Sequence, residues 1–160
     1  MAQTALVASI VPYMLKTPDH PEGVDQAVFD QIAAALKQDR AGFFSGFFRD
    51  FYGVGLLSHP VSQEVVDWSR AVAMQASLRA TLQCAQAFAT TDFRRDLAAF
   101  TTPTLIVHGT GDKTVPIDAT ARLAARGIPQ AQLIEYSGAP HGLLATHKER
   151  FAEDLLAFLK

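Results

Sequence analysis

Apolar residues form three short segments that are widely separated along the chain. The first is residues 4–11 (TALVASIV), closed by Pro12, and the others are residues 104–108 and 132–136. Strands of a parallel sheet covered by helices on both faces have this near-continuous apolar composition. The pattern predicts three parallel strands in one sheet.

The region between the first two strands has helical spacing instead. Residues 16–23 are polar and contain two prolines and a glycine, which is typical of a loop. The next apolar positions fall four residues apart, on one face of an amphipathic helix: Val24, Val28, Ile32 and Leu36. Residues 42–51 (GFFSGFFRDF) then place five phenylalanines around Gly46. We interpret this cluster as helical core, with one or two rings forming pocket walls.

Two serines mark the starts of further helices. Ser62 and Ser77 are good N-cap residues, and they precede predicted helices over residues 63–75 and 78–89. No alternation of apolar and polar residues interrupts this region. We therefore expect residues 16–99 to be an all-helical cap or lid.

The last third of the chain alternates strands and helices. Asp92 is placed to cap a short helix, and residues 117–126 form a second predicted helix ended by Gly127. Thr146 and Glu149 have the spacing of a capping box for a final helix. Its expected apolar stripe is Phe151, Leu155, Leu156 and Leu159. Such alternation indicates an α/β core with crossover helices, here over residues 1–15 and 100–160.

Composition excludes several classes of function. The chain has 160 residues, 49% hydrophobic residues and a net charge of −2, which predicts a globular protein without a basic surface for nucleic acid or membrane. The single cysteine, Cys84, has no partner for an internal disulfide, which fits a reducing compartment. No apolar segment reaches membrane-spanning length. We expect a cytoplasmic location.

Two polar residues follow the second and third predicted strands. Asp112 lies in the loop after residues 104–108, and His141 lies in the loop after residues 132–136. Catalytic groups gather at the carboxyl ends of parallel strands, so these side chains are expected to meet there. A carboxylate that orients an imidazole is the arrangement that activates a serine hydroxyl. Asp112 and His141 are therefore the candidate catalytic residues.

These segments carry a family resemblance. Residues 102–117 (TPTLIVHGTGDKTVPI) and 136–143 (YSGAPHGL) resemble the C-terminal half of α/β-hydrolases, above all the cofactor-free haloperoxidases, perhydrolases and aryl esterases. The resemblance implies that Asp112 is the triad acid and His141 the triad base, acting on a small ester without any cofactor. It also implies that the nucleophilic serine and the oxyanion-hole amides belong upstream of this chain.

The chain itself offers no substitute for that serine. No G-x-S-x-G sequence is present, and Ser45 in GFFSG has the wrong spacing within a helical region. Cys84 falls in mid-helix, where a small core residue is the better interpretation. We therefore expect the chain alone to be inactive as a serine hydrolase.

Other motifs favour structural roles. Gly109 and Gly111 imitate a dinucleotide fingerprint, but its third glycine position holds Thr114, so a tight turn explains them better. His20 and His59, each next to a proline, are expected in exposed loops, and His108 is expected to hold the loop beside Asp112. No histidine pattern suggests a metal site.

The leading hypothesis is an esterase or perhydrolase of the α/β-hydrolase type. The alternative is a non-catalytic fragment or assembly module. In either case the strand at residues 4–11 is expected to expose an unpaired edge, which favours a homo-oligomer or an N-terminal partner chain.

Overall fold

A computed structural model describes residues 3–160 of the chain. Its centre is a three-stranded parallel sheet formed by β1 (Thr4–Val7), β2 (Thr104–Gly109) and β3 (Ala131–Tyr136). The strand order is β1-β2-β3, with Thr104 opposite both Thr4 and Ala131. The predicted parallel sheet is confirmed.

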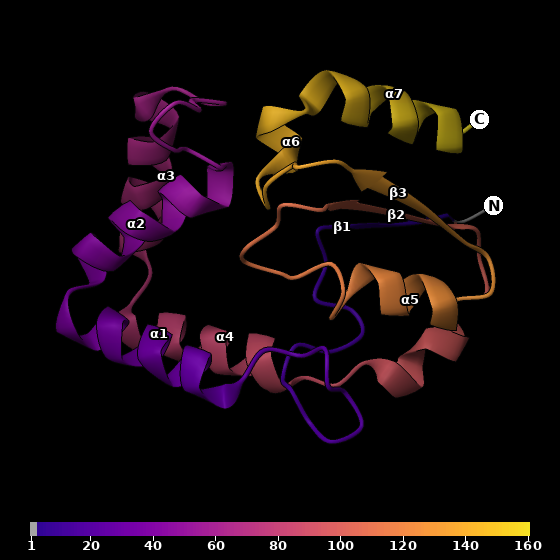
Figure 1. Cartoon of the computed structure of the whole chain (residues 1–160), viewed down its shortest axis with the longest axis horizontal. Coiled ribbons are helices and arrows are strands. Elements are labelled where there is room, and N and C mark those ends of the chain that lie inside the picture. The colour runs from indigo at the N-terminus through magenta and orange to yellow at the C-terminus, as the bar shows by residue number, and fades with distance from the viewer. Residues whose placement is uncertain (1–2) are drawn as a thin grey trace.

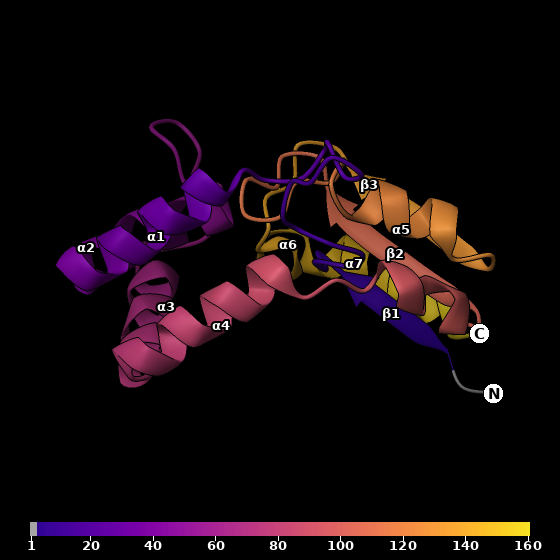
Figure 2. The same cartoon turned by 90° about the horizontal axis from the view of Figure 1, so that it is seen from below.

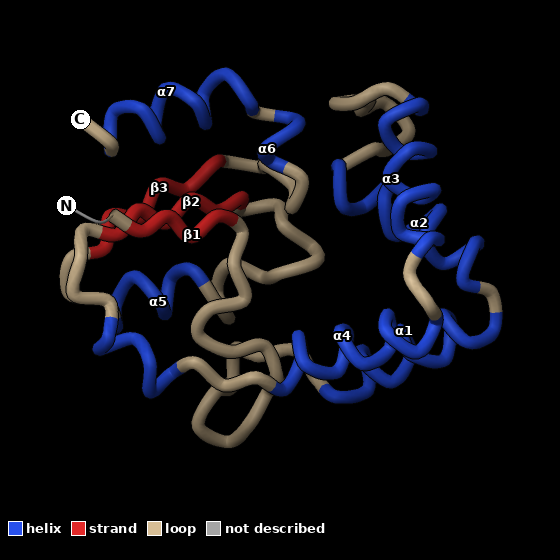
Figure 3. The backbone as a smooth tube through the Cα atoms, turned by 180° about the vertical axis from the view of Figure 1, so that it is seen from behind, coloured by secondary structure: helices blue, strands red, loops and turns tan. Residues whose placement is uncertain are grey.

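Helices cover both faces of this sheet (Figures 1 and 3). On one face lie α5 (Ala121–Gly127) and the 3-10 helix η1 (Arg94–Ala99), and on the other lie α6 (Leu143–Thr146) and α7 (Lys148–Phe158). Side chains of β2 alternate between the two: Ile106 packs with the α5 layer, whereas Leu105 and Val107 pack with the α7 layer. Every residue of β2 is buried as a result.

The first strand is shorter than predicted. The apolar run over residues 4–11 forms β1 only as far as Val7, because Ala8 has a φ of 45° that ends the extended conformation. Ala8 still donates its N–H to the Val107 carbonyl at 2.9 Å, which completes the ladder with β2. The prediction of a strand through Val11 was wrong, and β1 is only partly buried at its Thr4, Leu6 and Val7 positions.

Four helices lie together beside the sheet (Figures 1 and 2). They are α1 (Gln26–Gln38), α2 (Arg40–Tyr52), α3 (Gln63–Gln75) and α4 (Leu78–Thr90). Helix α1 contacts α2 and α4, and α2 contacts α3. Ser77 accepts a hydrogen bond from the Ala80 N–H at 3.1 Å and so caps α4 as predicted. Ser62 also stands at its predicted N-cap position, without a side-chain hydrogen bond.

These helices bury few residues. Of the predicted stripe in α1 only Leu36 is buried, and Val28 is 43% exposed. Cys84 in α4 is exposed, so its interpretation as a core residue was wrong. Helix α2 contacts α1, α3 and α6, whereas α1 packs mainly on α2 and α4, so many side chains of these helices stay exposed.

The C-terminal helices depart from the predicted boundaries. Residues 117–120 form a turn, with the Thr120 N–H donating to the Ile117 carbonyl, and α5 begins at Ala121. The capping box does not form, because Thr146 already belongs to α6 and His147 is the N-cap of α7. Leu156 is 59% exposed and therefore lies off the buried stripe.

Phe151 and Leu155 of the predicted stripe do face the sheet, where they are partly buried. Phe158 packs there with them, whereas Leu159 is 53% exposed. Among residues 3–160, no helix combines the length and the apolar character needed to cross a membrane.

Candidate active site

Asp112 is held in the loop that follows β2. Its Oδ1 accepts hydrogen bonds from the backbone N–H groups of Thr114 at 2.9 Å and Val115 at 2.8 Å. This local turn is one that aspartate favours. The carboxylate has no solvent exposure, so its direction is fixed by the backbone and by its histidine neighbours.

His141 reaches this carboxylate from the loop after β3. Its Nδ1 lies 2.7 Å from Asp112 Oδ2, a hydrogen-bond distance, so the expected meeting of the two side chains is confirmed. Because the carboxylate only accepts hydrogen bonds, Nδ1 is the protonated nitrogen and donates to it. The second ring nitrogen of the neutral imidazole is thereby left as a base.

Two glycines allow the two loops to approach so closely. A Cβ at Gly109 would lie 2.1 Å from the Ala139 carbonyl oxygen, and one at Gly111 would lie 2.6 Å from the Gly138 carbonyl oxygen. The Gly111 N–H donates to the Ala139 carbonyl at 3.1 Å. Backbone packs on backbone here, so the glycines serve a tight turn, as the sequence suggested.

His108, the last but one residue of β2, completes the surroundings of the carboxylate. Its side chain is fully buried, and its Nε2 lies 2.8 Å from the Val115 carbonyl oxygen and 3.2 Å from Asp112 Oδ2. The prediction that His108 holds the loop beside Asp112 is confirmed. Sequence reasoning did not foresee its direct contact with the carboxylate.

The surroundings of Asp112 favour its charged form. Burial alone raises the pKa of this carboxyl, but hydrogen bonds from His108, His141 and the Val115 N–H outweigh it and lower the pKa to about 2. The carboxylate is therefore ionised throughout the neutral range.

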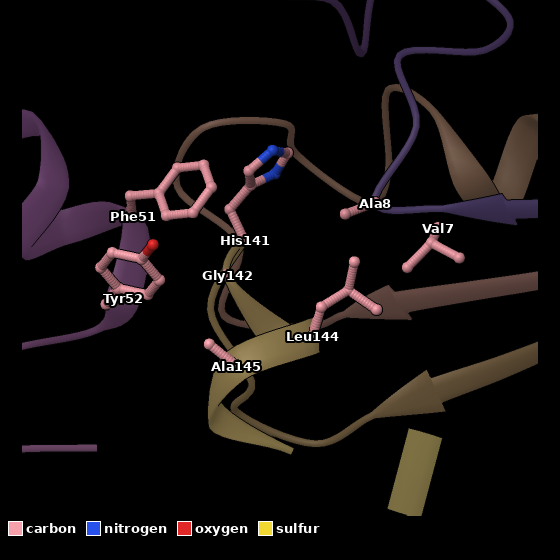
Figure 4. A pocket seen from close by; sticks show the side chains of 8 residues that line it. All are labelled: Val7, Ala8, Phe51, Tyr52, His141, Gly142, Leu144 and Ala145. Carbon is pink, nitrogen blue, oxygen red and sulfur yellow. The ribbon is translucent and has the colours of Figure 1, made fainter. Parts of the chain in front are cut away.

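A small cavity opens beside His141 (Figure 4). Its volume is about 280 Å³, and it lies between the end of β1, the start of α6 and the end of α2. The ring of Phe51 meets the His141 ring nearly edge-on at 4.8 Å between centroids. The Gly142 N–H donates to the Phe51 carbonyl at 2.7 Å, so α2 is tied directly to the histidine loop. The lining residues are Val7, Ala8, Phe51, Tyr52, His141, Gly142, Leu144 and Ala145.

A larger cavity of about 970 Å³ is lined by residues of α1, α2 and α4. Three members of the phenylalanine cluster line it, Phe43, Phe44 and Phe47, and it extends to Lys113 and Thr114 beside Asp112. Of the five rings in the cluster only Phe44 is buried, at 8% exposure, so the cluster forms pocket wall more than helical core. The phenylalanines of the cluster recur every three or four residues in the sequence. This spacing, which puts them on one side of a helix, was the signal for the wall.

The remaining candidates stay away from the site. Ser45 lies in α2, where it donates to the Ala41 carbonyl and accepts a hydrogen bond from Arg70. His59 is exposed as predicted. Within residues 3–160 no group of histidine, cysteine and acidic side chains is arranged to hold a metal ion.

His20 corrects a prediction. It is only 2% exposed, with Nδ1 2.9 Å from the Leu15 carbonyl oxygen and Nε2 3.0 Å from the Ala119 carbonyl oxygen. The loop before α1 is thus fastened to the turn that follows the Asp112 loop. The proline next to His20 in the sequence did not indicate that the side chain is buried.

Comparisons with known proteins agree with this geometry. The family profile of the alpha/beta hydrolase fold matches residues 7–148. A non-heme chloroperoxidase of Streptomyces lividans is 38% identical over the whole chain, and a bifunctional esterase/perhydrolase of Acinetobacter calcoaceticus is 33% identical over the whole chain. The chain spans 58% of the length of each of these two proteins.

A solved structure shows the same arrangement. The bromoperoxidase of Bacillus anthracis superposes with a TM-score of 0.93 at 38% identity, over 98% of this chain and 57% of its own. The three parallel strands and their helices match a C-terminal part of that fold. The chain therefore belongs to the α/β-hydrolase fold family.

Proposed function

We propose that this chain is the acid- and base-bearing part of a serine esterase or perhydrolase that acts on small esters. The observation that carries the proposal is the 2.7 Å hydrogen bond from His141 Nδ1 to a buried, ionised Asp112. The bond leaves Nε2 as the base, and the His141 side chain lines the small cavity. The names of the chloroperoxidase and esterase/perhydrolase relatives support the same class of reaction.

In the proposed reaction the nucleophile is a serine in a segment outside this chain. His141 Nε2 takes the proton of that hydroxyl as its oxygen attacks the ester carbonyl. Asp112 holds the imidazole in position and stabilises the positive charge that it gains. The proton then passes to the departing alcohol, and an acyl-enzyme remains.

Release of the acyl group uses the same base. His141 removes a proton from water, or from hydrogen peroxide, as the oxygen of that molecule attacks the acyl-enzyme. The proton returns to the serine oxygen, and the product is a carboxylic acid or a peracid. Phe51 restricts the space beside His141, which fits a small acyl group, and α1–α4 act as a cap with an aromatic inner face.

Reconstitution tests the proposal. The chain is joined to the upstream, serine-bearing segment of a chloroperoxidase relative, and hydrolysis of 4-nitrophenyl acetate is measured. We expect turnover that falls roughly 10³-fold or more in His141→Ala, because the base is lost. His59→Ala, which changes an exposed loop residue, is the matched control and should retain the rate. A folded, reconstituted enzyme with no turnover would contradict the proposal.

One observation favours the alternative of an assembly module. Within residues 3–160, β1 is hydrogen-bonded on the β2 side alone. An edge of this kind is a template for pairing with another strand. Under this alternative the chain associates through β1, and it shows no ester hydrolysis with any upstream segment to which it is joined.

A further inference from the structure

We propose that His108 is a positioning residue that donates its Nε2–H to both the Val115 carbonyl and Asp112 Oδ2, and so keeps the carboxylate aimed at His141. The assignment deepens the proposed function and rests on it for its catalytic meaning. Its physical content, a hydrogen bond that stabilises the Asp112 anion, is independent of any activity.

The two oxygen neighbours decide which nitrogen of His108 carries the proton. Nε2 lies 2.8 Å from one acceptor and 3.2 Å from the other. A bare lone pair at Nε2 would face a carbonyl oxygen and a carboxylate oxygen at these distances, which is repulsive. A proton there is attracted by both oxygens. The ring is thus an Nε2–H tautomer with a shared donor.

The other ring nitrogen makes histidine an unfavourable residue at this buried position. Nδ1 of His108 is buried and has no hydrogen-bond partner among residues 3–160. A buried polar atom without a partner is destabilising, and an apolar side chain at the same place would avoid the penalty. The contact that distinguishes histidine from an apolar residue here is the one made by Nε2.

Four donors surround the carboxylate of Asp112. Two backbone amides bind Oδ1, and two imidazoles bind Oδ2. The amides anchor one oxygen, so the position of the other decides how the carboxylate meets His141. His108 is itself immobilised in β2 and by the Val115 carbonyl, and it restrains Oδ2 from a fully buried position.

Other charged groups near this site are already paired. Lys113 lies 3.4 Å from Asp50 of α2. Glu135 of β3 is held at 2.7 Å by Arg122 of α5. His108 and His141 are the titratable side chains that contact the Asp112 carboxylate itself.

Two amide variants separate this role from simple packing. Glutamine places its side-chain nitrogen near the position of a histidine Nε2, whereas asparagine reaches only to the position of Nδ1. His108→Gln therefore retains the donor to Asp112 and His108→Asn loses it, although both are polar and smaller than histidine. The carboxyl titration of Asp112 is followed by carbon NMR in the full chain.

We expect His108→Asn to raise the pKa of Asp112 by about one pH unit, and His108→Gln to leave it near its low value. Equal titrations of Asp112 in the two folded variants would overturn the proposal. If His108→Asn fails to fold, His108→Leu replaces it in the comparison with His108→Gln. The same rise in the pKa of Asp112 is expected, and equal titrations of Asp112 would again overturn the proposal.

A second measurement connects the bond to the reaction. In the reconstituted enzyme, the acid limb of the pH profile of kcat/KM should shift to higher pH in His108→Asn. It should not shift in His108→Gln. An inactive reconstituted enzyme would refute the proposed function while the NMR titration still decides the role of His108. An acid limb that is unchanged in an active His108→Asn enzyme would refute the positioning role.

Discussion

Burial and hydrogen bonding act in opposite directions on Asp112. Burial disfavours the carboxylate, but two imidazoles and two backbone amides favour it more strongly. The side chain is consequently an anion held in a fixed position by hydrogen bonds, and it orients His141. The hydrogen bonds that hold the loop together also prepare the base.

This balance predicts a dependence of stability on pH. The folded pKa of Asp112, about 2, is below its ordinary value of 3.8, so the ionised carboxylate stabilises the fold above about pH 4. That contribution is lost as the pH falls toward 2. Between pH 5 and pH 2.5 the wild-type chain should lose roughly 2 kcal/mol more unfolding free energy than Asp112→Asn. Urea denaturation at both pH values measures the difference. Equal losses of unfolding free energy in the wild type and in Asp112→Asn would contradict the prediction.

His20 and His59 form a matched pair for a second prediction. His20→Leu removes the buried imidazole that lies between the Leu15 and Ala119 carbonyls, and should lower the free energy of unfolding by about 1–3 kcal/mol. His59→Leu changes an exposed residue and should stay within about 0.5 kcal/mol of wild type. Denaturant unfolding compares the two. Equal effects would show that the His20 contacts contribute nothing.

The two catalytic candidates could be found from sequence, whereas the surroundings of His20 could not. Asp112 and His141 each follow an apolar strand, and parallel strands bring such loops together at one edge. The burial of His20 depends on a carbonyl at Ala119, which is distant in sequence and leaves no local pattern. A histidine between prolines looks the same whether a distant turn covers it or not.

At the level of elements, the site depends on the close contact of two loops. The loop after β2 and the loop after β3 touch through their backbones at Gly109 and Gly111. Helix α2 adds a third wall through the Phe51 carbonyl and ring.

Alanine substitution at two glycines tests this packing. Gly109→Ala would place a Cβ 2.1 Å from the Ala139 carbonyl oxygen, so the loops must separate, at a cost of about 1–3 kcal/mol in stability. Gly46→Ala in α2 meets nothing within 4 Å, and should stabilise the helix by about 0.5–1 kcal/mol. Thermal unfolding of both variants gives the comparison. A Gly109→Ala chain as stable as Gly46→Ala would disprove the close loop contact.

Element boundaries were predictable where the signal is local. The helices over residues 63–75 and 78–90 begin after serines, as their sequence indicates. The end of β1 was missed because the positive φ of Ala8 is imposed on a residue with no special preference for it. The capping box at Thr146 was misleading because a short helix, α6, already occupies that residue.

In the molecule as a whole, β1 is hydrogen-bonded to a neighbouring strand on one side alone within residues 3–160. The N–H groups of Thr4 and Ala8 point toward the β2 side, where they bond Pro103 and Val107. Because successive N–H groups of a strand alternate, those of Ala5 and Val7 point to the other side. Leu144 is 54% exposed beside this region, so the edge is bordered by apolar surface.

We expect the chain to associate through this edge. Light scattering at micromolar concentration should give a mass above the 17.3 kDa of a single chain. Ala5→Pro removes one outward N–H without touching the β2 ladder, and should shift the chain toward the monomer. A wild-type chain that is monomeric and melts cooperatively would refute association through β1.

The catalytic pairing of Asp112 with His141 is tested most directly by the effect of Asp112→Asn on ester hydrolysis by the reconstituted enzyme. The amide keeps the shape of the side chain but does not favour the His141 tautomer with its proton on Nδ1. We expect a fall in kcat of roughly 10⁴-fold for 4-nitrophenyl acetate with little change in KM. A rate within about tenfold of wild type would contradict the claim that Asp112 orients His141 as the catalytic base.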